Sequence, residues 1–412
     1  METPARCRFC QHPLRNTFVD LGKSPLCESY LKREELNQME PFFPLRVWVC
    51  ESCLLVQLEQ YVGSETIFRD YAYFSSYSDS WLAHAQAYAD LAVERFELDS
   101  NSYVVEIGSN DGYLLKNFVE RGIPCLGVDP ARNVAAAAEK KGVPTLTEFF
   151  GRELGQRLAT EGPRPSLLIG NNVLAQVPDL NDFVAGVATL LAPEGVATFE
   201  FPHLLRLVEQ TQFDTIYHEH FSYFSLLSAR TVFSRHGLLV FDVDEIPTHG
   251  GSLRIYVRHA QDGSKPVQGK VAELVSREER EGLRDMGYYG SFCVKVEAVK
   301  RRLLRFLIDA KEEGKSVVGY GAPGKGNTLL NYCGIRTDLL AYTVDRNPFK
   351  QGMFTPGTHI PIFHPDHVGK TRPDYLLILP WNLKEEIMNQ MAHIRDWGAR
   401  FVIPVPDTEV FE

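Results

Sequence analysis

Residues 103–115, YVVEIGSNDGYLL, decide the fold of this chain. The mostly apolar run from Val104 to Ile107 is typical of a buried strand, and it passes directly into a polar turn. Gly108 and Gly112 let the backbone of that turn pass close to a ligand. Because open α/β sheets bind ligands beyond the carboxyl ends of their strands, this stretch predicts a strand that ends at a ligand-binding turn.

Similar apolar runs recur along the chain after this stretch. They begin at residues 125 (CLGVDP), 143 (VPTLTEFF), 166 (SLLIGNNVL), 195 (GVATFEFP), 239 (LVFDVDEI) and 252 (SLRIYVRH). The early runs are separated by helical stretches, a pattern typical of a doubly wound sheet. We therefore predict an α/β fold with a central Rossmann-like sheet.

The residues at the ends of the predicted strands indicate which ligand binds there. A dinucleotide fingerprint requires Gly-x-Gly-x-x-Gly, and Asn110 breaks that pattern. Asp129 ends the second strand, where a carboxylate accepts hydrogen bonds from a ribose diol. Together they predict the S-adenosylmethionine site of a class I methyltransferase, with a nicotinamide enzyme as the alternative. The predicted cofactor-binding residues are Glu106, Gly108, Asn110, Gly112, Tyr113, Asp129, Pro130, Phe149, Asn171 and Asn172.

Four of the eight cysteines form two CxxC knuckles, Cys7 with Cys10 and Cys50 with Cys53. Two such knuckles supply the tetrahedral sulfur set that zinc prefers, and four protein ligands predict a structural ion. A pair of disulfides or a redox CxxC is the alternative. The other cysteines lack this spacing and are expected to be ordinary buried thiols: Cys27, Cys125, Cys293 and Cys333.

The composition of the 412-residue chain indicates its class of partner. Lys and Arg number 43 against 53 Asp and Glu, a net charge of -10, which argues against nucleic acid and against an anionic membrane surface. No apolar run reaches the roughly 20 residues of a membrane span, and METPARCRFC is not a secretory signal. We expect a cytoplasmic protein with a small-molecule partner, for which a monomer suffices.

The last third of the chain predicts a second, smaller parallel sheet. Residues 292–310 place apolar side chains at helical spacing, as in a long helix that leads into a new domain. SVVGYGAPGKGNTLL at 316–330 then has the pattern of strand, glycine-rich turn and helix. Gly326 stands where a P-loop has Ser or Thr, so nucleotide hydrolysis is not expected. Lys325 and the amides that open the helix are expected to hold a diphosphate, unless the glycines serve packing alone.

The chain resembles the nucleotide-deoxysugar C-methyltransferases of antibiotic sugar pathways over nearly its whole length. The matching segments are the two CxxC knuckles, YFSSYSDSW (73–81), EIGSNDGYLL (106–115), NNVLAQVPDL (171–180), YHEHFSYFS (217–225), THGGSLR (248–254) and GYGAPGKGNTLLN (319–331). The resemblance implies a zinc-binding domain at 1–65, an S-adenosylmethionine-binding domain at 66–265, a helical connection at 266–310 and a Rossmann-like domain for the sugar nucleotide at 311–412.

The resemblance also implies methyl transfer to a ring carbon, usually C-3, next to the 4-keto group of a thymidine-diphosphate sugar. Such a reaction needs a base beside the carbon and a donor beside the ketone oxygen. By resemblance, His220 is the base, Glu219 its orienting partner and Tyr217 a substrate contact, and Tyr71 matches a further active-site tyrosine. The alternatives are a structural polar loop and a metal site, although the stretch lacks the His-Glu-x-x-His spacing. His218 is expected to be exposed.

Gln176 stands at a position where the resembling family commonly carries a catalytic histidine. Glutamine donates a hydrogen bond to an enolate oxygen but does not carry a proton at neutral pH. This departure leaves open methylation at C-5, an amino-sugar substrate, or a relative that binds both ligands without transfer. The residues expected to contact the substrate are His249, Ser252, Arg254, Tyr320, Lys325 and Asn327.

Overall fold

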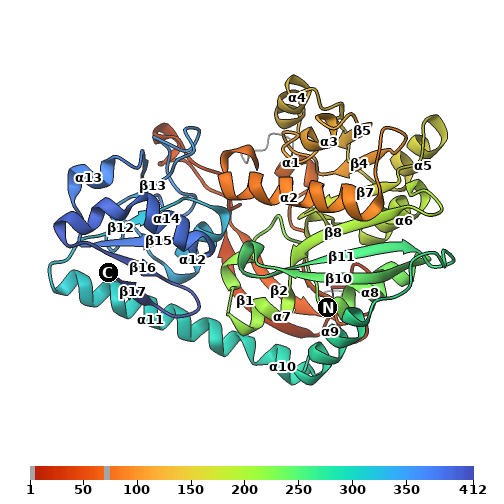
Figure 1. Cartoon of the computed structure of the whole chain (residues 1–412). Coiled ribbons are helices and arrows are strands. Elements are labelled where there is room, and N and C mark those ends of the chain that lie inside the picture. Colours follow the sequence, from red (N-terminus) through yellow and green to blue (C-terminus); the bar gives the residue numbers. More distant parts are fainter. Residues whose placement is uncertain (1–4, 69–74) are drawn as a thin grey trace.

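The computed structural model describes residues 5–68 and 75–412 (Figure 1). Within these residues the chain forms three sheets, of four, seven and six strands. The two larger sheets lie toward opposite ends of the molecule, with the four-stranded sheet between them. The predicted mixed α/β architecture is therefore confirmed.

The central sheet contains all seven strands predicted from the sequence. They are β4 (Val104–Ile107), β5 (Cys125–Val128), β6 (Thr145–Leu146), β7 (Leu167–Asn171), β8 (Val196–Pro202), β10 (Leu238–Ile246) and β11 (Ser252–His259). Their order is β10-β11-β8-β7-β4-β5-β6, parallel from β6 to β8 and antiparallel where β11 meets its neighbours. The sequence order reverses next to β4, so the ligand-binding turn lies at the switch point of the sheet.

Helices cover both faces of this sheet, which explains why its central strands are buried on both faces and mostly apolar. One apolar layer includes α5 (Arg152–Glu161), α6 (Leu180–Leu190) and α8 (Leu226–Ser234). The other includes α2 (Asp79–Phe96) and α3 (Lys116–Val119). The helices cover the faces of the sheet but not the carboxyl ends of its strands, where the connecting loops lie.

The four-stranded sheet combines the N-terminal segment with a distant one. Its strands are β1 (Asn16–Ser24), β2 (Phe43–Val49), β3 (Val56–Leu58) and β9 (Ser222–Tyr223), and all neighbours are antiparallel. Strand β9 is part of the YHEHFSYF stretch, and it pairs Tyr223 with Val56 and Ser222 with Gln57. The stretch that carries the predicted base is thus an edge of the N-terminal sheet.

The C-terminal sheet is a second parallel sheet with one antiparallel edge. Its strands in spatial order are β14 (Ile362–Phe363), β13 (Thr343–Val344), β12 (Val317–Tyr320), β15 (Tyr375–Ile378), β16 (Arg400–Ile403) and β17 (Glu409–Phe411). Helix α12 (Gly324–Cys333) opens at the predicted glycine-rich turn, and the predicted long helix is α11 (Phe292–Glu312). Phe292 of α11 stacks on Phe18 of β1 at 4.5 Å between ring centroids, so one core joins the N-terminal and C-terminal sheets.

The remaining elements are short or connect the sheets. They are the α-helices α1 (Ser64–Phe68), α4 (Arg132–Lys140), α7 (Leu204–Glu209), α9 (Gly269–Arg280), α10 (Met286–Gly290), α13 (His367–Thr371) and α14 (Lys384–Gln390), and the 3-10 helices η1 (Arg33–Glu35), η2 (Ser75–Tyr77), η3 (Leu174–Gln176), η4 (Phe213–Thr215), η5 (Thr248–Gly250), η6 (Trp381–Leu383) and η7 (Ala392–Trp397). In the described ranges, no helix combines the length and the apolar character needed to cross a membrane.

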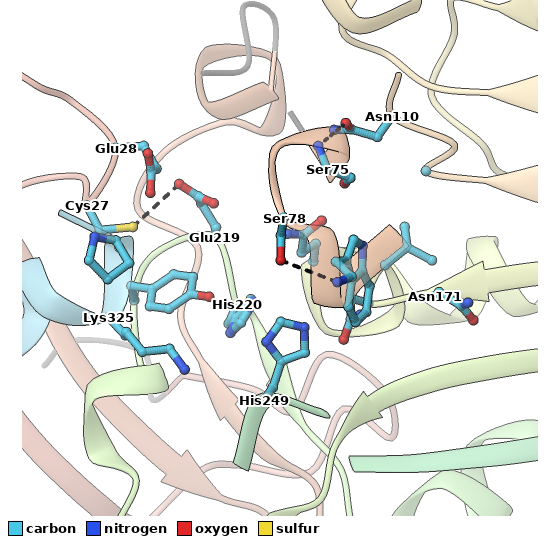
Figure 2. A pocket seen from close by; sticks show the side chains of 18 of the residues that line it. Cys27, Glu28, Ser75, Ser78, Asn110, Asn171, Glu219, His220, His249 and Lys325 are labelled. Carbon is cyan, nitrogen blue, oxygen red and sulfur yellow. Dashed lines mark hydrogen bonds between the residues drawn. The ribbon is translucent and has the colours of Figure 1, made fainter. Parts of the chain in front are cut away.

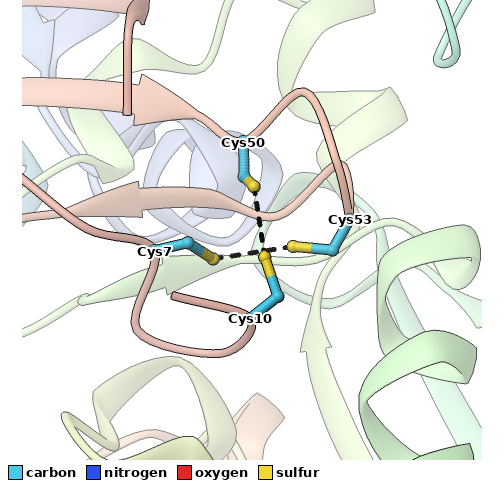
Figure 3. A group of neighbouring side chains, drawn as sticks. All are labelled: Cys7, Cys10, Cys50 and Cys53. Carbon is cyan, nitrogen blue, oxygen red and sulfur yellow. Dashed lines mark hydrogen bonds between the residues drawn. The ribbon is translucent and has the colours of Figure 1, made fainter. Parts of the chain in front are cut away.

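The four knuckle cysteines converge at one point of the N-terminal module (Figure 3). Their sulfurs all lie within 4.8 Å of one another, with 3.6 Å between Cys7 and Cys53 and 3.5 Å between Cys10 and Cys50. These separations exceed the ~2.05 Å of a disulfide bond, and they fit four thiolates around one zinc ion. The Nε2 of Gln57 donates to the sulfur of Cys7 at 3.2 Å, which helps to orient that ligand.

Removing one sulfur from this cluster should release zinc and destabilise the N-terminal sheet. We expect Cys50→Ser to lose bound zinc and more than ~3 kcal/mol of unfolding free energy, since zinc contributes ~10–16 kcal/mol to the folding of small finger peptides. Metal analysis and chemical denaturation would measure both effects. Cys293→Ser, outside the cluster, is the matched control and should keep its zinc. A Cys50→Ser protein with full zinc content would contradict the assignment.

Candidate active site

A cavity of about 540 Å³ opens between the central and the C-terminal sheets (Figure 2). Loops at the carboxyl ends of both sheets line it, and so do residues of the N-terminal module, among them Cys27 and Glu28. The loop residues that follow the strands include Gly108, Asp129, Asn172, Gly321, Asp345 and Asn382. Two parallel sheets therefore point their ligand-binding edges into one space.

The turn after β4 is built around Asp129. Its carboxylate accepts the backbone N–H of Asn110 at 2.9 Å and that of Ala131 at 2.9 Å. Burial raises the pKa of Asp129 above its ordinary value. Each carboxylate oxygen accepts more than one hydrogen bond, so the side chain still fits a ribose diol. Asp129 thus shapes the turn and faces the predicted cofactor space.

Most of the predicted cofactor-binding residues line this cavity, and two do not. The lining residues are Gly108, Asn110, Tyr113, Asp129, Pro130, Phe149, Asn171 and Asn172. Glu106 lies fully buried behind the turn, where burial raises the pKa of its carboxyl well above the ordinary value. Gly112 has a φ of +73°, and a Cβ there would lie 3.0 Å from Val143, so this glycine serves the packing of the turn.

His220 presents one ring nitrogen to the cavity. Its Nδ1 lies 3.0 Å from the carbonyl oxygen of Thr215, so Nδ1 donates that hydrogen bond and Nε2 is left as the acceptor. Burial is the main cause that lowers the pKa of His220 to about 4; the hydrogen bond to Thr215 opposes this shift, and the charge of Lys325 adds to it. The ring of Tyr217 packs on it at 4.1 Å between centroids. The predicted base is therefore neutral and oriented at neutral pH.

Glu219 and Cys27 meet on the opposite wall of this region. The thiol of Cys27 lies 3.5 Å from Oε1 of Glu219, and both side chains line the cavity. Cys27 is buried, as expected from the sequence, but it belongs to the site rather than to a core. The role of Glu219 as partner of His220 stays a prediction, since the hydrogen bond of His220 runs to Thr215.

The predicted substrate residues divide into two groups. His249, Tyr320 and Lys325 line the cavity, whereas Ser252, Arg254 and Asn327 do not. Arg254 faces Glu200 across the β11–β8 pair and forms an ion pair of 2.6 Å with it. Ser252 donates to the carbonyl of Thr248 at 2.9 Å, and Asn327 donates to that of Cys27 at 2.6 Å. These three hold the walls of the site in place.

Two of the remaining predicted positions lie in the described chain, and one does not. Gln176 ends η3 and lines the cavity. His218 was expected to be exposed, and this was wrong: only 3% of it is exposed, and its Nε2 donates to the carbonyl of Pro44 at 3.1 Å. It is buried because its stretch packs on the N-terminal sheet. Tyr71 falls outside the described residues.

Several cavity residues carried no sequence signal. Lys350 is buried, and its ammonium donates to the hydroxyl of Tyr30 at 2.8 Å and to the carbonyl of Ala322 at 2.9 Å. It also forms an ion pair of 3.2 Å with Glu28. No motif or spacing connects residues 28, 30 and 350, so only the folded chain brings this network to the cavity wall.

Comparisons with known proteins identify the family. The model of a zinc binding domain matches residues 7–68, that of a methyltransferase domain matches 81–243 and that of a C-methyltransferase C-terminal domain matches 247–406. The C-methyltransferase NovU of Streptomyces niveus is 38% identical over 404 residues, which cover 98% of this chain and 96% of that protein. The chain belongs to this C-methyltransferase family. Its central domain is the S-adenosylmethionine-binding domain, and its four N-terminal cysteines are the zinc site.

Among solved structures, magnesium protoporphyrin IX methyltransferase from Synechocystis PCC 6803 with bound SAH is 15% identical with a TM-score of 0.35 and covers 43% of this chain and 83% of that chain. The PH0226 protein from Pyrococcus horikoshii OT3 is 13% identical with a TM-score of 0.36 and covers 49% of this chain and 99% of that chain.

Asp129 offers a direct test of the donor site of this C-methyltransferase. We expect Asp129→Ala to weaken S-adenosylhomocysteine binding at least about tenfold, because hydrogen bonds to a charged group contribute ~1.5–3 kcal/mol. Isothermal titration calorimetry would measure the dissociation constant. Asp99→Ala, in the loop before β4 at the opposite edge of the sheet, is the control and should bind normally. Equal affinities of the two variants would place the donor elsewhere.

Proposed function

We propose that the enzyme methylates the ring carbon next to the ketone of a nucleoside-diphosphate 4-keto deoxysugar, with C-3 as the favoured position. The observation that carries this proposal is the position of His220 in one cavity between the donor edge of the central sheet and the carboxyl edge of a second Rossmann-like sheet. The relative's name states carbon methylation, and the motifs of the chain resemble those of sugar enzymes. In this proposal, the central domain binds the methyl donor and the C-terminal domain binds the sugar nucleotide.

The residues around His220 are suited to remove a proton from carbon. A carbon beside a ketone is acidic because the charge left behind spreads onto oxygen. The Nε2 of His220 accepts the proton, and the hydrogen bond from Nδ1 to Thr215 holds the ring in the required tautomer. S-adenosylmethionine, when bound at the turn after β4, supplies an electrophilic methyl group. The walls of the cavity hold carbon and donor in line and exclude water.

The C-terminal sheet offers suitable groups for the nucleotide. Helix α12 begins at the turn after β12, so its first amides point toward the cavity and favour a diphosphate there. Arg346 lines the same end with a half-exposed guanidinium, whose ion pairs with Asp79 and Glu386 are long, at 3.9 and 3.7 Å. Such a cation is available for phosphate oxygens.

Gln176 favours a second candidate function within the same class. It lines the cavity at a position where the resembling family has a histidine, so this wall of the cavity offers an amide in place of a group that carries a proton. We propose methylation at C-5, or an amino-sugar substrate, as this second candidate. Restoring the family residue by Gln176→His would test whether the position of methylation changes.

The proposed function is tested by incubating the enzyme with S-adenosylmethionine and thymidine-diphosphate 4-keto-6-deoxyglucose or its 2-deoxy analogue. Mass spectrometry should show the gain of one methyl group, and NMR of the product should place it. A methylated ring carbon next to the ketone supports the proposal. Binding of both ligands without transfer to either sugar would count against the 4-keto deoxysugar as substrate.

The base is tested by His220→Asn. We expect this variant to bind S-adenosylhomocysteine normally but to lose at least about 100-fold in methyl transfer and in solvent deuterium exchange at the acidic carbon, since a general base contributes ~10²–10⁴-fold. His364→Asn, at an exposed histidine, is the control. Exchange at the normal rate in His220→Asn would show that another residue takes the proton.

The low pKa of His220 predicts an unusual pH profile. The base is active when neutral, so kcat/KM should fall as the pH drops through about 4, and not near the ordinary histidine value of ~6.5. The free energy of unfolding should change in the same direction. Between pH ~6.5 and about 4 the unfolded chain binds a proton at this histidine and the folded chain does not, so stability is full above pH ~6.5 and falls as the pH drops toward 4. Rates in buffers from about pH 5 to 7 should therefore be constant. A midpoint near 6.5 would contradict the buried, neutral base.

A further inference from the structure

The side chain of Lys325 extends from the start of α12 into the cavity. Figure 2 shows its ammonium end pointing toward His220 and His249. Its Nζ donates to Oδ1 of Asn382 at 2.7 Å and lies 4.9 Å from the centre of the Trp381 ring. A single lysine thus extends from the start of α12 toward the predicted base.

Trp381 and Asp214 hold this ammonium in place. The indole N–H of Trp381 donates to Oδ2 of Asp214 at 2.6 Å, and both side chains are buried. The indole also packs against the turn that carries His249: a Cβ on Gly250 would lie 2.5 Å from Trp381. Trp381, which contacts the ammonium of Lys325, is therefore itself held by Asp214 and lies beside the turn that carries His249.

Helix α12 is also bonded to the segment that carries the base. The hydroxyl of Thr328, one turn after Lys325, donates to the carbonyl of Ile216 at 3.0 Å. Ile216 directly precedes Tyr217, and the Nδ1 hydrogen bond of His220 runs to its neighbour Thr215. These two hydrogen bonds fix the start of α12, which carries Lys325, relative to the segment that carries His220, although the two belong to different domains.

The charge of Lys325 acts on this end of the cavity. After burial, it is the largest influence that lowers the pKa of His249, and it contributes to the low pKa of His220. The pKa of Asp214 is raised to about 6, because burial outweighs the opposing effects of the Lys325 ammonium and of the hydrogen bond from Trp381. Burial lowers the pKa of Lys325 as well, and the carboxylate of Asp214 counteracts this shift. The ammonium form of Lys325 favours an anion that forms beside the predicted base.

The diphosphate end has a different cation. Arg346 lines that part of the cavity with weakly engaged guanidinium nitrogens, whereas Lys350 is saturated by Glu28, Tyr30 and a backbone carbonyl. The backbone amides of α12 remain for the phosphates whatever the side chain of Lys325 does. The side chain is thus free for another task.

We propose that Lys325 is a catalytic residue that donates a hydrogen bond to the ketone oxygen of the substrate and stabilises the enolate. This assignment rests on the proposed function. As the C–H bond breaks, the proton passes to Nε2 of His220, the C–H electron pair forms the carbon–carbon double bond, and the carbonyl π pair moves onto the oxygen that faces Lys325. The lysine stays protonated. The double-bond pair then forms the bond to the methyl carbon, the carbonyl re-forms, and the methyl–sulfur bond breaks with its electron pair going to sulfur, so that the donor becomes a neutral thioether. His220 finally releases its proton to solvent.

The experiment uses full-length Lys325→Met, a side chain of similar length without a charge. Solvent deuterium exchange at the acidic carbon of thymidine-diphosphate 4-keto-6-deoxyglucose is followed by NMR without methyl donor, and thymidine diphosphate binding is measured by calorimetry. We expect exchange to fall at least about 100-fold, as on removal of an oxyanion donor, while thymidine diphosphate affinity stays within about twofold. Normal zinc content and S-adenosylhomocysteine affinity show that the variant is folded.

Lys325→Gln provides a second test, which also serves if the methionine variant does not fold. It keeps a neutral hydrogen-bond donor, so we expect a smaller loss of exchange, about tenfold, with KM for the sugar nucleotide unchanged. Exchange at the wild-type rate in a folded variant overturns the assignment, and so does a tenfold loss of thymidine diphosphate affinity, which would make Lys325 a phosphate ligand. If the wild-type enzyme itself exchanges no proton of this sugar or its 2-deoxy analogue, the proposed function fails and the assignment fails with it.

Discussion

The pairing of β9 with β3 is the interaction on which the site depends. Strand β3 is short, and the Cys50–Cys53 knuckle forms the connection between it and β2. Zinc at the knuckles therefore fixes the hairpin whose outer strand receives Ser222 and Tyr223. Because Phe221 alone separates those residues from His220, the zinc site helps to set the position of the predicted base. A structural zinc module is in this way part of the active-site scaffold.

The cavity exists because two parallel sheets turn the same kind of edge toward each other. Loops at the carboxyl ends of the strands of each sheet form two walls of the cavity. The N-terminal module adds Cys27 and Glu28 beside them. The shared core between β1, α11 and the C-terminal sheet keeps this arrangement in register. The proposed sites for the donor, the base and the sugar nucleotide are thus brought together by contacts between segments rather than by any single domain.

Burial and charge act together at the catalytic end. His220 and His249 both have depressed pKa values, because the cavity wall removes water from their rings and Lys325 adds positive charge. A neutral histidine can accept a proton, and a nearby cation favours the anion that this transfer creates. In the proposed reaction, the positive charge that disfavours protonation of these histidines would also stabilise the negative charge that forms on the substrate.

The sequence by itself determined the strands of the central sheet, the long helix α11, the four zinc ligands and most of the residues with which the central sheet lines the cavity. These features follow from local rules: apolar periodicity sets burial, cysteine spacing sets a metal knuckle, and residues at strand ends meet at one edge. It did not reveal the short N-terminal strands, whose pairing with β9 joins segments over 160 residues apart.

Only the tertiary structure decided which side chains face the cavity. Arg254 and Asn327 lie in motifs of the site, yet the one pairs with Glu200 and the other with the backbone of Cys27. Cys27 carries no motif and lines the cavity, and His218, one residue from Glu219, is buried against Pro44. The direction of a side chain depends on the partners that packing brings to it, and these partners come from distant parts of the chain.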